Sequence, residues 1–203
     1  LEDYPSTKGY HDSFDYVDYT EDIYVGYRFF ETFEGASDRV IYPFGYGLSY
    51  TTFDIEVLGA VKKEDTIIFN VKVTNTGRMA GKEVVQLYVS APSGKLLKPK
   101  KRLVDFEKTK ELQPGESQLM TLKITEYGLS SYDDLGKFID ASYVLEKGKY
   151  EFYLGSNVRD AAKISFFWEN FVDKVVCTLS HKVVPAALKK RLLGDGHYEE
   201  LPV

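Results

Sequence analysis

Cysteine and histidine, the residues that most often build disulfide frameworks and metal sites, are scarce in this sequence. The single cysteine, Cys177, excludes an intramolecular disulfide and a cysteine-based zinc site, so the fold depends on its core alone. The three histidines, His11, His181 and His197, lie far apart, and neither a His-x-x-x-His pair nor a Gly-x-Ser-x-Gly motif is present. We therefore expect no metal, no cofactor and no serine nucleophile.

Long apolar runs and an excess of basic charge are also missing. No stretch approaches the roughly 18 apolar residues of a membrane helix, and the opening residues lack the basic, apolar and small-residue order of a secretion signal. The formal net charge of −5 disfavours nucleic acid and anionic membranes, because binding to either needs a basic surface. We expect neither partner, and the single cysteine together with the missing signal slightly favours the cytoplasm.

Aromatic and β-branched residues are abundant by contrast. The 203 residues include 16 Tyr and 13 Phe, which favours strands over helices. From Phe53 onward, short segments alternate apolar and polar residues and are separated by turns that contain Gly or Pro, the pattern of an antiparallel β-sandwich. Seven such segments are found, at 53–61, 66–77, 81–92, 101–112, 117–128, 148–157 and 161–170.

Two details support the sandwich. The alternate apolar positions from Ile67 to Val73 point to one face, which identifies that face as core. In the sequence Gln-Pro-Gly-Glu, Pro114 sets φ for the second position of a turn and Gly115 tolerates a positive φ at the third. A type II turn is therefore predicted between two strands.

The first 52 residues have a different character. Residues 1–22 read as an irregular loop, Ile23–Val25 as a short strand-like run, and the following Glu-Gly-Ala-Ser-Asp-Arg-Val as a turn. The stretch Tyr-Pro-Phe-Gly-Tyr-Gly-Leu-Ser-Tyr-Thr-Thr-Phe, at 42–53, is dense in aromatic rings and turn formers. It is either a packed hinge between two structural units, in which Gly45 and Gly47 allow close backbone approach, or the floor of a binding site.

Several of these blocks together resemble one enzyme family. The sequence YTEDIYVGYRFFETF, then YPFGYGLSYTTF, then VTNTGRMAGKEVVQLYV, LQPGES and GKYEFYLGSNVRD follow in the order and spacing of the C-terminal part of glycoside hydrolase family 3, the β-glucosidase and β-xylosidase type. The resemblance covers about residues 19 to 160. It implies a mainly β chain, an antiparallel immunoglobulin/fibronectin type III-like β-sandwich preceded by an irregular segment from the edge of an α/β sandwich domain.

The resemblance also implies a domain organisation. Residues 1–42 would end the α/β sandwich domain, 43–52 would be the interdomain hinge, and 53–170 would form the fibronectin type III-like domain. Residues 171–203 would be an extension or a linker to a further domain. Within this tail, Val183–Leu193 suggests a short helix, with Pro185 in its first turn and Gly194-Asp195-Gly196 ending it.

A retaining glycosidase needs two carboxyl groups beside the bond that it cleaves. The family nucleophile is an Asp of the barrel domain, and the one Ser-Asp pair here, Ser37-Asp38, lacks the apolar strand before it and the aromatic residue after it. The family acid/base is a Glu upstream of the Glu-Asp-Ile-Tyr-Val block. We therefore expect no catalytic residue in this chain, and no sugar-binding residue is assigned.

Two clusters of charged residues are interpreted as surface features and not as ligand sites. An acidic stretch, formed by Asp12, Asp15, Asp18, Glu21 and Asp22, lacks the spacing of a calcium loop and reads as a solvated loop. A basic run, formed by Lys95, Lys98, Lys100, Lys101 and Arg102, would blunt a sheet edge, with contact to an anion or partner domain as the alternative.

Three single residues stand out within the aromatic blocks. Arg28 and Arg159 are expected to stack on rings and pair with carboxylates across the domain contact, with contact to substrate as the alternative. Trp168 is expected at a core or edge position, although a lone tryptophan can also stack on a sugar.

These observations predict a fragment or subunit of a retaining β-glycosidase, cut from a larger enzyme and inactive alone. The chain would support catalytic barrel and α/β domains that lie elsewhere in the same polypeptide or in a separate chain, and the complete enzyme would hydrolyse a β-linked saccharide. The alternative is a stand-alone carbohydrate-binding or interaction module, which would show a planar row of exposed Tyr or Trp on one sheet face.

Overall fold

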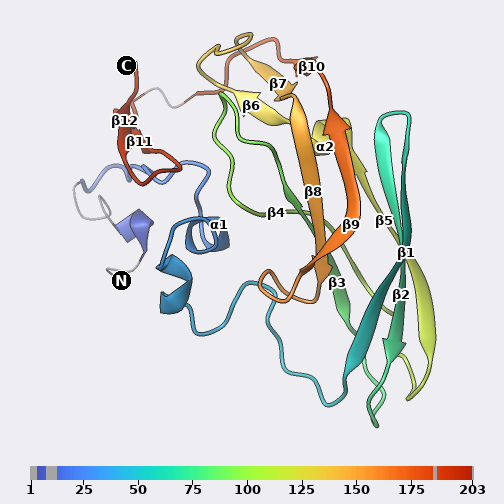
Figure 1. Cartoon of the computed structure of the whole chain (residues 1–203). Helices are drawn as coiled ribbons and strands as arrows, with labels where there is room; N and C mark the ends of the chain where they lie inside the picture. Colours follow the sequence, from blue (N-terminus) through green and yellow to red (C-terminus); the bar gives the residue numbers. More distant parts are fainter. Residues whose placement is uncertain (1–3, 8–12, 185–186, 203) are drawn as a thin grey trace.

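The computed structural model describes residues 4–7, 13–184 and 187–202, and strands dominate it (Figure 1). One sheet has the order β1-β2-β5 and the other the order β4-β3-β8-β9, with antiparallel pairing throughout. The bounds are β1 Phe53–Lys63, β2 Thr66–Asn75, β3 Val84–Ser90, β4 Arg102–Lys108, β5 Ser117–Thr125, β8 Gly148–Gly155 and β9 Ala162–Asn170. The seven predicted segments are thus the seven strands of a β-sandwich, which confirms the predicted fold class.

The core lies between these two sheets. The side chains of Ile67, Phe69, Val71 and Val73 on β2 are fully buried, as their alternation predicted. They face β8, where the ring of Phe152 lies 5.0 Å from that of Phe69. Each such side chain contributes about 1.5–3 kcal/mol by burial.

The turn before β5 has the predicted geometry. Gly115 has φ +78°, and the N–H of Glu116 donates to the carbonyl oxygen of Gln113 at 2.9 Å. Because only glycine adopts this φ without strain, Gly115 fixes the point at which the chain reverses.

A third, smaller sheet caps one end of the sandwich, at the top of Figure 1. It has the order β10-β7-β6 and consists of β6 (Ser131–Asp133), β7 (Ser142–Leu145) and β10 (Lys174–Thr178), with the short helix α2 (Glu126–Leu129) before it. The carboxylate of Asp133 accepts hydrogen bonds from the N–H groups of Lys137 and Phe138 and so shapes the β6–β7 loop. These strands were not predicted, because three to five residues show too little alternation.

The N-terminal segment and the tail lie together beside the sandwich, at the left of Figure 1. The segment contains the short helices η1 (Pro5–Thr7), α1 (Tyr27–Phe30) and η2 (Ala36–Arg39). The N–H of Leu192, in the tail, donates to the carbonyl oxygen of Thr20 at 2.7 Å. The predicted strand at Ile23–Val25 was wrong, since the N–H of Tyr24 closes a turn onto Glu21 instead.

The predicted helix at Val183–Leu193 was also wrong for the described part of that stretch; Pro185 itself lies outside the described residues. The chain forms a hairpin of β11 (Lys190–Leu192) and β12 (Tyr198–Glu200), and Gly196 with φ +89° lies in its turn. The Gly-Asp-Gly sequence reverses the chain rather than ending a helix, because the strand on each side supplies a partner for the other.

Candidate functional site

Aromatic rings form the centre of the contact between residues 20–46 and the sandwich, which we call the junction. The ring of Tyr27 stacks on Phe44 with centroids 4.4 Å apart, and it meets Tyr88 edge-on at 6.3 Å. Its hydroxyl oxygen accepts a hydrogen bond of 2.9 Å from the N–H of Leu103, at β4. Burial raises the pKa of the Tyr88 hydroxyl far above its usual range. The junction is therefore a packed contact and not a loose loop.

The loop at 41–52 is docked at only one of its two glycines. Gly45 has φ +88°, and a Cβ there would lie 2.4 Å from Nε2 of Gln86, so the expected close approach is confirmed. No atom of this chain lies within 4 Å of the corresponding point at Gly47, so close approach there stays a prediction. Beyond it, Leu48 and Tyr50 are 91% and 95% exposed.

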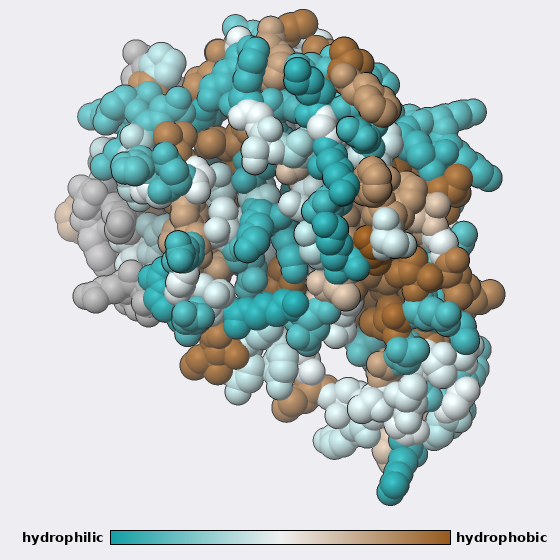
Figure 2. All heavy atoms as spheres, viewed as in Figure 1, coloured by the Kyte–Doolittle hydropathy of each residue, from teal (hydrophilic) through white to brown (hydrophobic). Residues whose placement is uncertain are grey.

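This exposure is visible on the surface. Figure 2 shows hydrophobic groups protruding at the lower left margin, where the loop runs in Figure 1. The exposed apolar side chains of the loop are Ile41, Tyr42, Phe44, Tyr46, Leu48 and Tyr50. Several exposed apolar side chains on one loop are consistent with a contact with another protein unit.

Arg159 ties the junction to the sandwich by polar contacts. Its Nε lies 3.0 Å from Oε1 of Glu31, and its Nη2 donates to the carbonyl oxygen of Ser37 at 2.6 Å. The predicted pairing of this arginine with a carboxylate is confirmed. The guanidinium of Arg28 has no hydrogen-bond or ion-pair partner among the described residues, and its pairing across the domain contact stays a prediction.

Arg191 joins the tail to both neighbouring segments. Its Nε lies 2.9 Å from Glu199, across the hairpin, and its Nη1 lies 2.9 Å from Asp134 and 3.5 Å from Asp22. Only 6% of the arginine side chain is exposed. Burial raises the pKa of Asp22 while Arg191 opposes the shift. Sequence alone gave no signal for this cluster, because its members come from three distant segments.

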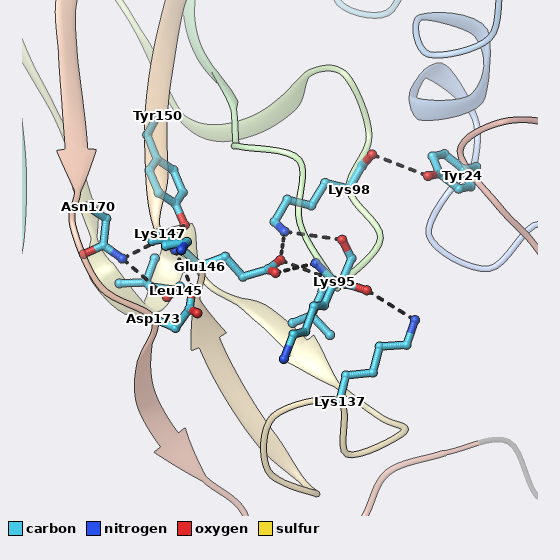
Figure 3. A network of polar contacts seen from close by, with 11 residues as sticks. Tyr24, Lys95, Lys98, Lys137, Leu145, Glu146, Lys147, Tyr150, Asn170 and Asp173 are labelled. Carbon is cyan, nitrogen blue, oxygen red and sulfur yellow. Dashed lines mark hydrogen bonds and ion pairs between the residues drawn. The ribbon is translucent and has the colours of Figure 1, made fainter.

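A second buried ion pair holds the loop before β4 (Figure 3). The carboxylate of Glu146, just after β7, is paired with Nζ of Lys98 and accepts from the N–H groups of Lys95 and Leu96 at 2.6 and 3.2 Å. Figure 3 shows Glu146 reaching towards this loop, whose Lys98 carbonyl oxygen accepts from Tyr24. One carboxylate thereby links the third sheet to the junction.

The basic run does more than blunt an edge. Lys98 is buried, Nζ of Lys101 donates to the carbonyl oxygen of Val158 at 3.0 Å, and Nη2 of Arg102 donates to that of Gly128 at 2.7 Å. β4 does lie at an edge of its sheet, as the edge interpretation requires. These three side chains also make internal contacts that hold β4 and the loop before it to the rest of the chain.

The acidic stretch is likewise more structured than predicted. Asp12 lies outside the described residues, but Glu21 is only 2% exposed and Asp22 is paired with Arg191. The Oε2 atom of Glu21 is buried without a hydrogen-bond partner among the described residues. A solvated loop thus describes only the beginning of this stretch.

A cavity of about 330 Å3 opens beside the junction, between α1, the end of β3, the loop before β4, β6 and the tail. We call it the junction cavity. Two carboxylates, Asp22 and Asp134, lie in its wall, and both are held by the same guanidinium. The cations in its wall are Arg28, Lys98, Arg102, Lys137 and Arg191.

The junction offers no arrangement that resembles a glycosidase centre. Retaining hydrolysis uses one carboxylate as nucleophile and a second carboxyl group as acid/base, whereas both carboxylates of the cavity pair with Arg191. The Ser37-Asp38 pair lies on η2, outside the cavity wall. Over residues 4–7, 13–184 and 187–202, no group of three or more His, Cys, Asp or Glu is placed to hold a metal ion.

The surface of the sandwich does not favour a sugar-binding module. In the described part of the chain, no exposed Tyr or Trp lies on its seven strands. Trp168, on the edge strand β9, packs against the core beside Tyr150, with ring centroids 5.2 Å apart. This agrees with the predicted core or edge position. No helix within the described ranges is long and apolar enough to cross a membrane.

Comparison with known proteins places these features in one family. Residues 83–158 match the fibronectin type III-like domain. β-Glucosidase A of Butyrivibrio fibrisolvens is 54% identical over all of this chain, which covers 26% of that protein. The crystal structure of a β-glucosidase from Paenibacillus barengoltzii superposes with a TM-score of 0.91 and 42% identity, over all of this chain and 23% of that one.

A second solved structure carries the family name. The GH3 β-glucosidase of Bifidobacterium adolescentis has a TM-score of 0.70 and 32% identity, over 87% of this chain and 24% of its own. The chain therefore spans about a quarter of the length of these relatives. From its sequence, its fold and its fibronectin type III-like domain, the chain belongs to glycoside hydrolase family 3, where it corresponds to the C-terminal part of the β-glucosidases.

Proposed function

We propose that this chain is the supporting C-terminal part of a retaining β-glucosidase whose catalytic carboxylates lie outside the 203 residues. Residues 1–42 would close the α/β sandwich domain, 43–52 would be the hinge, 53–170 the fibronectin type III-like domain, and 171–203 an extension or a linker to a further domain. The complete enzyme would hydrolyse a β-linked saccharide by double displacement through a glycosyl-enzyme intermediate.

The exposed apolar loop at 41–52 carries this proposal. Its first half is fixed to the sandwich by Gly45 and by Val158, whose N–H donates to the carbonyl oxygen of Phe44 at 3.0 Å. Its second half presents Leu48 and Tyr50 to solvent. A rigidly anchored apolar surface is suited to packing against a neighbouring domain, and such contacts commonly bury several hundred Å2 or more.

Complementation of enzyme activity tests the proposal. The chain would be mixed or co-expressed with the remainder of the B. fibrisolvens β-glucosidase, and hydrolysis of an aryl β-glucoside would be measured for each part and for the pair. We expect no hydrolysis by the chain alone and restored hydrolysis by the pair. Hydrolysis by the chain alone, or a pair that associates but stays inactive, would contradict the assigned division of roles.

A further inference from the structure

The charges in the wall of the junction cavity are only partly balanced within the chain. Arg191 contacts three carboxylates, those of Asp22, Asp134 and Glu199, which outnumber its single positive charge. Lys98 is neutralised by Glu146. Neither wall carboxylate, however, forms an ion pair with Arg28, Arg102 or Lys137 within the described ranges.

Three cations remain without a carboxylate partner within the described ranges. Nη2 of Arg102 donates to the carbonyl oxygen of Gly128, and Nζ of Lys137 donates to that of Lys95 at 3.2 Å. The half-buried guanidinium of Arg28 has no such contact. Because each guanidinium carries five N–H donors, most donors of the two arginines are unused.

The two arginines are close enough to affect each other. Burial lowers the pKa of Arg102, and the positive charge of Arg28 lowers it further. Two like charges at the wall of one partly buried cavity repel each other, and an anion between them would relieve this repulsion. Arginine binds carboxylate and phosphate groups in a bidentate manner, so both the charge and the geometry favour an oxyanion.

We propose that the junction cavity binds a small oxyanion, a carboxylate or phosphate group, held by Arg28 and Arg102 with Lys137 nearby. The volume of about 330 Å3 is sufficient for a small ligand. Ser131 and Tyr132 also line the cavity, and each carries a hydroxyl group that could add a hydrogen bond. The bound group would join α1, β4 and the third sheet. This site lies outside the catalytic role proposed for the rest of the enzyme.

Titration of the 203-residue chain tests the site. Sodium phosphate and sodium acetate would be added in separate experiments, with sodium chloride at equal ionic strength as the baseline, while backbone amide signals are followed by NMR. We expect saturable shifts around residues 28, 102 and 131 with phosphate or acetate. Shifts that do not saturate, or that chloride reproduces, would overturn the proposal.

Matched variants identify the residues involved. Arg28→Met should weaken binding about ten-fold, the effect of losing one charge-assisted contact. Arg78→Met makes the same change on an exposed turn outside the cavity and should bind like the unmodified chain. Arg28→Lys keeps the positive charge but loses the paired N–H donors of the guanidinium, so it should give an intermediate affinity. It replaces Arg28→Met if that variant does not fold. Equal affinities for all variants would refute the role of Arg28.

The same titration on the complemented pair distinguishes two sources of the oxyanion. Binding that persists in the pair identifies an anion taken from solution. Binding in the chain that is lost in the pair identifies an acidic side chain of the neighbouring domain as the natural occupant. Failure of complementation would leave the titration of the chain alone as a separate test.

Discussion

Nε of Arg159 lies 3.0 Å from Oε1 of Glu31, although the two residues are 128 positions apart in the sequence. This ion pair joins the loop after β8 to the segment that follows α1. Together with the bond from Arg159 to the carbonyl oxygen of Ser37, it fixes the N-terminal segment on the sandwich. The orientation of the exposed loop at 41–52 depends on such contacts.

Replacement of Arg159 should loosen the junction without unfolding the sandwich. Arg159→Met removes the ion pair and two bonds to carbonyl oxygens, and we expect a local loss of about 1–2 kcal/mol. Amide hydrogen exchange at residues 27–33 should accelerate accordingly, with exchange on β2 unchanged. Arg78→Met serves as the control. Faster exchange throughout β2 would show instead that the whole chain had been destabilised.

The two glycines of the loop should respond differently to alanine. Gly45→Ala introduces a strained φ and a contact of 2.4 Å with Gln86, whereas Gly47→Ala meets no atom within 4 Å. Strain in the left-handed region costs about 1–2 kcal/mol. Urea unfolding, monitored by near-ultraviolet circular dichroism, should show a lower free energy of unfolding for Gly45→Ala only. A similar decrease for both variants would contradict the conclusion that the loop contacts the sandwich at Gly45 and not at Gly47.

The buried pair of Glu146 and Lys98 should behave as one unit. Their side chains are only 4% and 8% exposed, so removal of one partner leaves a buried charge. Glu146→Gln should therefore destabilise the chain by about 3–5 kcal/mol, and Lys98→Met in the same chain should recover part of that loss. Urea unfolding of the unmodified chain, the two single variants and the double variant gives the coupling free energy between Glu146 and Lys98.

A surface pair provides the control for this cycle. Glu151 contacts Lys149 and Lys163, whose side chains are about half exposed. Glu151→Gln should cost less than about 1 kcal/mol, because exposed pairs contribute little. Equal effects of Glu146→Gln and Glu151→Gln would show that burial of the first pair is unimportant.

Glu126 should make stability depend on acid pH. Burial alone would raise its pKa, but hydrogen bonds from Lys174 and Lys62 outweigh it and hold the pKa below the usual 4.5. Since the folded state then binds its proton less readily than the unfolded state, the stabilisation is present above pH 4.5 and is lost as the pH falls through the lower, folded pKa.

Glu126→Gln isolates this contribution. The difference in unfolding free energy between the variant and the unmodified chain should be constant near neutral pH and shrink on acidification, in urea titrations between about pH 3 and pH 7. A difference that grows as the pH falls would contradict the direction of the shift.

The sandwich was predictable because its signals are local. Alternation over β2 marked the core face, and Pro114-Gly115 marked a turn whose conformation few other residues adopt. The hairpin of β11 and β12 was missed because Val183–Leu193 suggested a helix that Gly194-Asp195-Gly196 would end. Pairing with β12 decided the structure of β11, and a local pattern carries no information about such a partner.

The junction was predictable only in outline. The position of Arg159 among family-like residues indicated a carboxylate partner, but nothing in the sequence identified Glu31. The cluster of Arg191 with Asp22 and Asp134 joins residues up to 169 positions apart. Long-range ion pairs follow from tertiary packing, so charged residues that read as solvated in the sequence can be buried in the fold.

The central claim is that this chain acts as one part of a larger β-glucosidase. Intact mass under denaturing conditions, for everything that co-purifies with the chain from its source, tests it most directly. We expect either one longer polypeptide that contains the 203 residues or a second polypeptide that carries the catalytic domains, with aryl β-glucoside hydrolysis in the same fractions. A single species of 23.2 kDa, purified without a partner, would contradict it.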